Sequence, residues 1–339
     1  MDRNTKGYLA KPTCDPVKSS EMTIAAQLRE EPALHNVTSR ALVRFSWAVV
    51  GWNVLIILWG AVVRATGSGA GCGNHWPLCN GVIVPVNPRV DTLIEFTHRV
   101  TTGLALPLVI WLLVWTFRAT TRGALPRVMV SLSLALTLNE ALLGALLVKL
   151  GYVAGNQSMA RAAFLSLHLT NTLLLVAALT MTATSLGRGL RRNQIALERK
   201  STPIALLALF STVFVGVTGS LAALGDTLFP SRSLASAWHE DFSANAYFLL
   251  RIRWFHPVCS VIAAVFIAWL ISIAWRRLEQ PYAQAVAALL ALQFAIGIAD
   301  VLLLAPVTLQ ILHLLLANLF WIALVLLASR VSIRQIKTT

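Results

Sequence analysis

The sequence is poor in charged residues, and acidic residues are the scarcest of them. Only 12% of the 339 residues are charged, and only 14 are Asp or Glu. An average soluble domain carries about 25% charged residues. Because 57% of the residues are also hydrophobic, a soluble globular protein and a disordered chain are both excluded. Four cysteines are too few for a disulfide-rich scaffold. These absences leave a polytopic membrane protein.

The formal net charge of +14 would suit a nucleic-acid-binding protein if the chain were soluble. In a membrane protein such an excess is typical of basic loops on the cytoplasmic side. Lys and Arg concentrate here in alternate connections between the apolar segments. We therefore expect contact with the lipid bilayer and no nucleic-acid partner.

Runs of about 20 apolar residues predict membrane-spanning helices. We expect eight, at 45–63, 92–117, 125–148, 161–185, 203–225, 250–275, 282–303 and 306–328. The positive charges predict a multi-pass inner (cell) membrane protein with both termini in the cytoplasm, the mitochondrial inner membrane being the alternative. The long outer loops are then 64–91 and 226–249.

The spans form two similar sets of four. The Thr-Gly-Ser sequence at 66–68 resembles that at 218–220. In the third and seventh spans, Glu140 and Gly144 have the same spacing as Gln293 and Gly297. The fold class is therefore an all-α polytopic membrane protein whose eight helices form two pseudo-symmetric four-helix bundles.

This repeat predicts five regions. They are a flexible cytoplasmic tail at 1–43, an N-terminal half at 44–186, a basic cytoplasmic linker at 187–202, a C-terminal half at 203–329 and a cytoplasmic tail at 330–339. The first region is polar and has no apolar segment like that of a secretory signal.

Four histidines lie inside the expected spans, two in each half: His98, His168, His256 and His313. They lie at similar depth near the outer surface, on helices that run in the same direction. A membrane histidine is a functional hypothesis, with an interhelical hydrogen bond as the alternative. Facing imidazoles without surrounding cysteines or carboxylates suit axial ligation of haem iron better than zinc binding.

Glu95 is the acidic residue that stands out, because it precedes His98 by three residues on one helix face. It suits proton transfer, or else pairing with Arg99, Arg64 or an imidazole. The corresponding residue of the second half is Arg253. This difference predicts chemistry in the first half and a supporting role for the second.

Cys72 and Cys79 lie in the glycine-rich first outer loop. A disulfide between them is sterically reasonable on an oxidising side of the membrane. Two interpretations stay open: a structural staple, and a redox-active pair that exchanges with a partner.

Together these segments resemble the heme A synthase family. The resemblance rests on GAVVRATGSGAGCGNHWPLCNG, EFTHRVTTG, HLTNTLLL, RWFHPVCS and LQFAIGIADVLLLAPVTLQILHLLLANLFW, and it covers about 45–328. Members of the family oxidise a ring methyl of heme O to a formyl group and carry a b-type haem. Some relatives have a second cysteine pair, whereas 226–249 contains no cysteine here.

The resemblance implies roles for the residues above. Glu95 is then the catalytic acid, and the iron ligands are His98 and His168 for the substrate heme O and His256 and His313 for the cofactor haem b. Arginines near the outer surface are candidates for holding haem propionates, or else for anchoring helices at the lipid headgroups: Arg64, Arg99, Arg251 and Arg253.

Heme O synthase and terminal oxidase assembly factors are the partners that this function implies. The electron acceptor is unknown, and a homo-oligomer is left open. Two other functions compete with heme A synthesis. One is a di-haem b-type electron-transfer cytochrome, which needs the same histidines but not Glu95. The other is a transporter, which predicts broken helices and a polar path at the membrane midplane.

Overall fold

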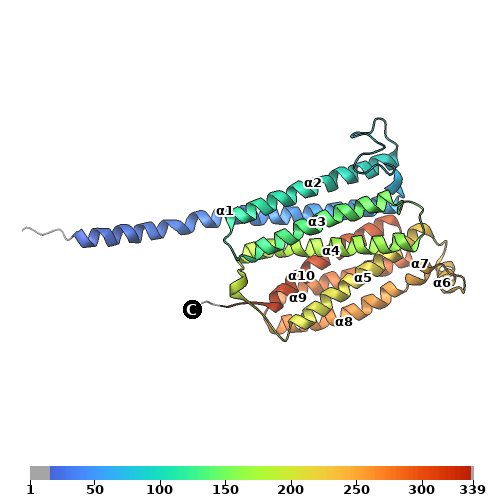
Figure 1. The fold of residues 1–339 in the computed structure, drawn as a ribbon. Helices are drawn as coiled ribbons and strands as arrows, with labels where there is room; N and C mark the ends of the chain where they lie inside the picture. Colours follow the sequence, from blue (N-terminus) through green and yellow to red (C-terminus); the bar gives the residue numbers. More distant parts are fainter. Residues whose placement is uncertain (1–15, 337–339) are drawn as a thin grey trace, which may run out of the picture.

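The computed structural model describes residues 16–336, with side chains from residue 40 onward, and this part of the chain is nearly all helical (Figure 1). The α-helices are α1 (Pro16–Ala65), α2 (Val90–Ala119), α3 (Leu125–Lys149), α4 (Met159–Arg188), α5 (Thr202–Leu228), α6 (Leu234–Phe242), α7 (Phe248–Ile252), α8 (Phe255–Arg276), α9 (Gln280–Leu302) and α10 (Val307–Ser332). Two short 3-10 helices, η1 (Ser68–Ala70) and η2 (Arg192–Gln194), and two strands, β1 (Ile195–Leu197) and β2 (Ile333–Gln335), complete the elements.

Eight helical segments of the described chain are long and apolar enough to cross a membrane, which confirms the expected number. Seven are the long helices α1–α5, α9 and α10, and the eighth combines α7 and α8. Large apolar side chains such as Trp111, Phe210 and Val265 are exposed along them. A soluble protein would bury such side chains, whereas a spanning helix directs them toward lipid. The protein is therefore a multi-pass membrane protein.

Helix α1 is longer than the expected first span. It begins at Pro16, and Figure 1 shows its N-terminal part extending well beyond the other helices. Segment 16–43 is thus helical where we expected irregular chain, because adding residues to an existing helix avoids the cost of nucleation. Residues 1–15 of the expected tail lie outside the described residues.

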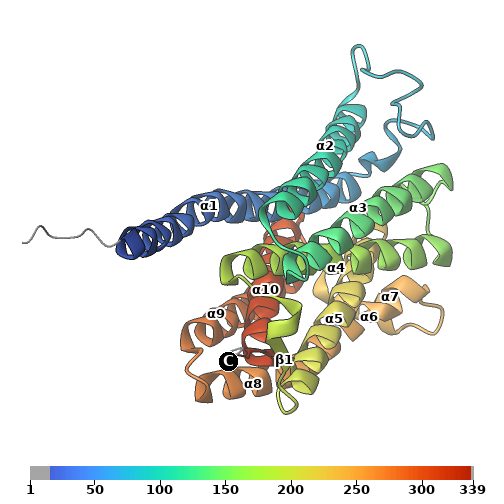
Figure 2. The same cartoon turned by 60° about the vertical axis from the view of Figure 1, so that its left-hand side comes forward.

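The spans form two four-helix bundles, as the repeat predicts. In the first half, each of α1–α4 contacts its neighbours in a closed ring, so that α2 and α4 lie diagonally opposite. In the second half the ring is α5, α8, α9 and α10, with α8 and α10 on the diagonal. Figure 2 shows the two groups beside one another. In each half the two histidine-bearing helices therefore face each other across the bundle.

The halves meet mainly through α4, which packs on α5 and α10, and through α1, which packs on α10. The indole Nε1 of Trp321 donates a hydrogen bond of 2.8 Å to the carbonyl of Leu173 across this interface. Near the C-terminal end of α1, Arg64 donates to Gln310 of α10 at 2.9 Å and to the carbonyl of Ala223 of α5 at 2.6 Å. One guanidinium thus joins both halves.

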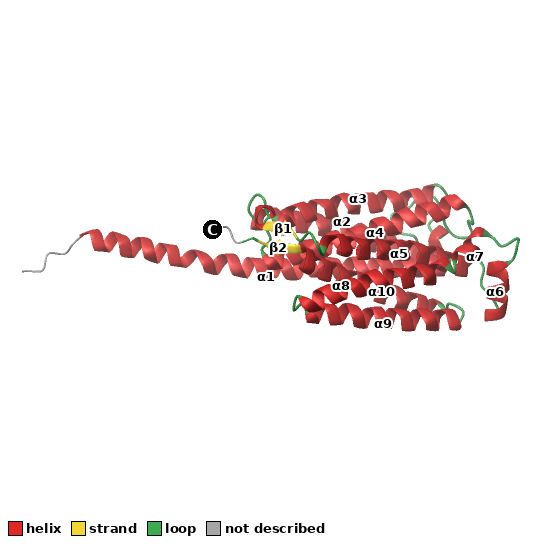
Figure 3. Ribbon diagram, turned by 90° about the horizontal axis from the view of Figure 1, so that it is seen from below, coloured by secondary structure: helices red, strands yellow, loops and turns green. Residues whose placement is uncertain are grey.

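The linker and the C-terminal segment pair with each other at the end of the molecule from which α1 extends (Figure 3). Strand β1 is antiparallel to β2, with Ala196 opposite Arg334. The sequence analysis treated these two regions as separate. Strands of three residues have too short a pattern to be recognised in a sequence, so this pairing was missed.

Helices α6 and α7 lie at the opposite end (Figure 3), where α6 falls in the expected loop 226–249 and α7 overlaps the start of the expected sixth span. Ser233 and Ser236 form reciprocal hydrogen bonds that cap the start of α6. Arg253 joins this segment to α5, because its side chain lies 3.1 Å from Asp226 and 3.6 Å from Asp241. Burial raises the pKa of Asp241, while the charge of Arg253 acts in the opposite direction.

Candidate functional site

The two histidines of the second half face each other. The ring centroids of His256 in α8 and His313 in α10 are 6.3 Å apart, and the ring planes are nearly perpendicular at 86°. Nδ1 of His256 lies 3.2 Å from the carbonyl oxygen of Val215. This contact suits an N–H donor at Nδ1 and leaves Nε2 for a metal.

Glycines make room for three of the four histidines. A Cβ atom on Gly219 would lie 2.8 Å from Cε1 of His256, and one on Gly297 would lie 3.0 Å from Cε1 of His313. In the first half, a Cβ on Gly60 would lie 3.2 Å from Cε1 of His98. A larger residue at Gly219 would force a shift, and at the other two glycines the ring would have to give by a few tenths of an ångström, so these helices pack closely on the imidazoles.

The histidines of the first half, His98 in α2 and His168 in α4, occupy the matching diagonal. Nδ1 of each ring is buried without a hydrogen-bond partner. Buried polar atoms are rarely left unpaired, and those that are call for an explanation such as a missing ligand.

The glycine contacts correct one part of the expected repeat. Gly60 and Gly219 contact the second-helix histidine of their own halves, so these two glycines are equivalent. Gly67 instead lies beyond α1 in a left-handed turn with φ of 67°. The match between the Thr-Gly-Ser sequences at 66–68 and 218–220 is therefore wrong by about two helical turns.

Glu140 and Gln293 occupy equivalent positions beside the fourth-helix histidines. Oε1 of Glu140 lies 3.4 Å from Nδ1 of His168. Nε2 of Gln293 lies 3.2 Å from Nε2 of His313. From the sequence, both residues served only to align the halves, and neither was expected to have a role. The missed signal was a carboxylate in an apolar span, which is costly enough to suggest a function.

Glu95 is buried, and both of its carboxylate oxygens have partners. Oε1 accepts hydrogen bonds from Arg99 at 3.0 and 2.5 Å, and Oε2 accepts one from the backbone N–H of Cys72 at 2.8 Å. The ion pair with Arg99 is one of the alternatives that the sequence left open. Glu95 lies on α2, three residues before His98. Its catalytic role stays a prediction.

The first outer loop is closed by a disulfide between Cys72 and Cys79, both of which are almost fully buried. Arg99 donates to the carbonyls of Gly73, His75 and Leu78, so it holds the loop on α2. A partner thiol has no access to these sulfurs unless the loop opens. Burial therefore favours the structural staple, and exchange with a partner stays a prediction.

The four arginines considered for haem propionates all contact protein groups. Arg64 joins the two halves, and Arg99 holds Glu95 and the disulfide loop. Arg251 donates to the carbonyl of Ala244 at 2.5 Å, and Arg253 donates to the carbonyl of Phe229 at 2.6 Å. Their role toward propionates stays a prediction, while their role in holding the outer loops is present in the structure.

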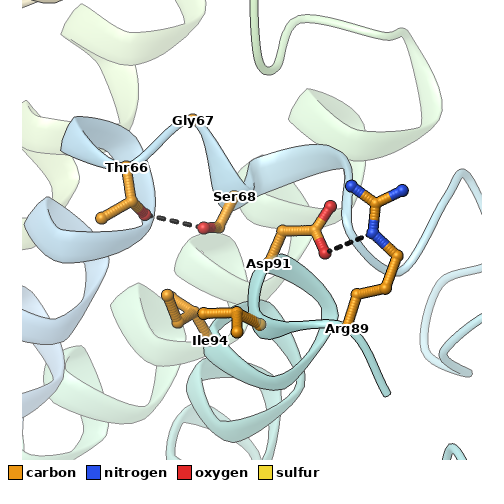
Figure 4. A pocket seen from close by; sticks show the side chains of 7 residues that line it. Thr66, Gly67, Ser68, Arg89, Asp91 and Ile94 are labelled. Carbon is orange, nitrogen blue, oxygen red and sulfur yellow. Dashed lines mark hydrogen bonds and ion pairs between the residues drawn. The ribbon is translucent and has the colours of Figure 1, made fainter. Parts of the chain in front are cut away.

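An open pocket of about 610 Å³ lies where α1 ends and α2 begins. Figure 4 shows its lining, in which Thr66 and Ser68 are hydrogen-bonded at 2.7 Å and Arg89 pairs with Asp91 at 3.3 Å. None of the four histidines lines this pocket, and neither does Glu95. We therefore place the candidate site in the bundles and not here.

The side chains of the bundles fit haem. Each half presents two diagonal histidines, and the ring spacing of the second pair leaves room for a metal about 2 Å from a nitrogen of each ring. Among the residues whose side chains are described, no three His, Cys, Asp or Glu groups converge as a metal cluster requires. Paired imidazoles in a bundle core are typical of bis-histidine haem ligation.

Three relatives show what the chain is similar to. It is 43% identical over 296 residues to a protoheme IX farnesyltransferase of Thermus thermophilus, which covers 85% of this chain and 48% of that protein. It is 31% identical over 188 residues to a heme A synthase of Exiguobacterium sp., which covers 56% of this chain and 60% of the relative. It is 38% identical over 115 residues to a heme A synthase of Halalkalibacterium halodurans, which covers 34% of this chain and 36% of the relative.

The chain thus spans about half the length of the first relative, and no more than 60% of the other two. These relatives confirm the expected resemblance to heme A synthases. The protein family described as cytochrome oxidase assembly protein matches residues 43–325, which is nearly the whole membrane part. The chain therefore belongs to this family of cytochrome oxidase assembly proteins.

Proposed function

We propose that the protein is a heme A synthase, a membrane oxidoreductase that converts a ring methyl of heme O to a formyl group for terminal oxidase biogenesis. The observation that carries this proposal is the presence of one diagonal histidine pair in each bundle, with a carboxylate, Glu95, three residues before the second-helix histidine in the first half only. Family membership and the names of two relatives support it.

The two halves then have different tasks. The first half binds heme O through His98 and His168, and the second half binds haem b through His256 and His313. The support for this division is the residue three positions before the second-helix histidine. In the first half that residue is the carboxylate Glu95 of α2. In the second half it is Arg253, which precedes α8 and joins α5 to α6.

The residues of the first half position the substrate and handle protons. Oxidation of the methyl proceeds through a hydroxymethyl group and a hydrated aldehyde, and each stage releases protons and electrons. Glu95 accepts or relays a proton, or orients the water that supplies oxygen, while Arg99 and the Cys72 N–H keep the carboxylate in place. Haem b, when bound, supplies one-electron transfer through its iron.

The proposed function implies a place and partners. We propose a cell-membrane location with both termini in the cytoplasm, for which the basic connections are the support. A heme O synthase must supply the substrate. The similarity to a protein named protoheme IX farnesyltransferase supports a functional association between this chain and such an enzyme. Terminal oxidase assembly factors would receive the product.

Pigment analysis tests the proposal directly. The protein is co-expressed with a heme O synthase, and the haems of the membrane are extracted and separated. We expect heme A to accumulate only when the wild-type chain is present. If the folded, haem-loaded protein yields only heme O and heme B, it is not a heme A synthase.

A di-haem electron-transfer cytochrome is the second candidate, because four ligating histidines are all that it requires. It predicts that heme A never appears and that Glu95 serves only to hold the loop. The transporter alternative has less support. The described spans are continuous helices at mid-depth, and the break between α7 and α8 lies near the outer end.

A further inference from the structure

Glu140 is a carboxylate inside a spanning helix, and its oxygens contact an amide, a hydroxyl and an imidazole. Oε2 accepts a hydrogen bond of 2.5 Å from the amide of Asn171, and Oε1 accepts one from the hydroxyl of Thr172. Oε1 also lies 3.4 Å from Nδ1 of His168. Asn171 is itself held by Asn139, whose amide donates to it at 2.8 Å. The carboxylate is therefore fixed beside the imidazole by groups of α3 and α4.

The contact between Glu140 and His168 meets the distance of an ion pair but not the direction of a hydrogen bond. Nδ1 of His168 is buried and has no hydrogen-bond partner in the described residues. Glu140 is thus the acceptor within reach of this nitrogen. The other nitrogen, Nε2, is the one that remains to bind iron.

The second half has an uncharged residue at the same place. Nε2 of Gln293 lies 3.2 Å from Nε2 of His313, which leaves Nδ1 of that ring for iron, whereas Oε1 of Glu140 lies 3.4 Å from Nδ1 of His168. The two halves therefore differ in formal charge next to one candidate iron ligand. Both oxygens of Glu140 accept hydrogen bonds, so a Gln at this position would keep the shape of the side chain but lose one acceptor.

A ligating histidine usually donates its second N–H to a neighbouring group, and that group tunes the metal. A carboxylate makes the imidazole a stronger electron donor than a neutral amide does. A stronger donor stabilises the oxidised iron and lowers the reduction potential. The same pair of histidines in the two halves is then expected to give two different potentials.

We propose that Glu140 is a positioning residue that orients His168 and keeps the reduction potential of a haem in the first half below that of a haem in the second half. The inference rests on the proposed function to the extent that the pair His98 and His168 must bind a haem. It adds a residue, and a purpose for the asymmetry between the halves, that heme A synthesis alone does not require.

The test measures potentials without turnover, with protohaem as the probe. Protohaem is added to the purified full chain carrying His256→Ala, so that only the first half binds it. Spectroelectrochemical titration then compares this protein with one that also carries Glu140→Gln. We expect the Glu140→Gln substitution to raise the midpoint potential of the haem by about 59 mV. For a one-electron couple this shift corresponds to a tenfold larger ratio of reduced to oxidised haem at a fixed applied potential.

Two further variants separate tuning from a structural role. Glu140→Asp keeps the charge and should retain most of the low potential. Gln293→Glu, measured in a chain with His98→Ala, should lower the potential of the haem in the second half. A residue that only packs the helices would move neither value in these directions.

The outcomes distinguish this inference from the proposed function. An unchanged potential in a folded Glu140→Gln protein overturns the role of Glu140 and leaves heme A synthesis intact. If that variant does not fold, the Gln293→Glu protein decides, and an unchanged potential there overturns the inference. Failure of the His256→Ala protein to bind protohaem at all removes the first-half haem site, and with it both proposals.

Discussion

The backbone N–H of Cys72 donates a hydrogen bond of 2.8 Å to Oε2 of Glu95, so the disulfide loop rests directly on the candidate catalytic carboxylate. Arg99 completes this arrangement by binding Oε1 and three loop carbonyls. The two cysteines, Glu95 and Arg99 thus form one connected unit, of which the cysteines and the carboxylate are buried. A substitution at Glu95 therefore affects both chemistry and loop structure, and the experiments must separate the two.

Glu95→Gln is expected to abolish heme A formation while the haem of the second half stays bound. Gln keeps one acceptor, for either the Cys72 N–H or Arg99, but loses the charge that handles protons. Glu95→Ala is a poorer test, because it leaves the buried guanidinium of Arg99 unpaired, which costs about 3–5 kcal/mol. Haem extraction and the absorption spectrum measure both properties. A normal yield of heme A from the Gln variant would remove Glu95 from the mechanism.

Removing the disulfide tests the two interpretations of the cysteine pair. Replacing both Cys72 and Cys79 by Ala should lower the stability of the loop by about 2–3 kcal/mol, since a short closed loop is released. The unfolding temperature in detergent measures this change. If the pair is a staple, heme A synthesis persists at a temperature where the variant is folded. Loss of synthesis with unchanged stability would support the redox interpretation.

Gly219→Ala should displace His256 and deplete the haem of the second half. The new Cβ would lie 2.8 Å from the ring, a distance at which something must shift. Gly144→Ala is the matched control, because a Cβ there has no neighbour within 4 Å. Pyridine haemochrome content of the two purified variants gives the comparison. Equal haem content would show that His256 does not depend on this glycine.

Arg64→Met should loosen the contact between the two halves. It leaves Oε1 of Gln310 without its donor, and a buried unsatisfied group costs about 1–3 kcal/mol, whereas the carbonyl of Ala223 still accepts from Thr227. We expect a lower unfolding temperature and faster proteolysis of the linker at 187–202. Arg89→Ala is the control, because its side chain is 85% exposed. A stable Arg64 variant with reduced haem content would instead favour the propionate role.

Much of the fold was predictable because membrane helices obey simple rules. The apolar runs predicted eight spans, and the structure has eight helical segments of that kind. The cysteine spacing allowed a disulfide, which is present. The expected irregular chain at 16–43 is helical instead, and the outer segment 226–249 contains α6. Neither departure alters the bundles.

The candidate site was predictable only in its parts. The order of the histidines along the chain identified the four candidate ligands. The residues that contact them could not be identified, because they belong to other helices. Gly60 and Glu140 were given no role from the sequence, and Gly219 was matched to Gly67 instead of Gly60. The importance of all three comes from contacts with histidines that lie far away in sequence. Sequence similarity between the halves also misaligned the first and fifth helices by about two turns.

The amino-acid sequence alone determined the class of protein, the number of spans, the repeat and the residue types able to bind iron, because hydropathy and side-chain chemistry are local properties. Tertiary structure alone decided that Glu95 holds the disulfide loop, that Arg64 joins the halves and that Glu140 lies beside His168. These are contacts between different helices, and their existence depends on how the helices rotate and pack against one another.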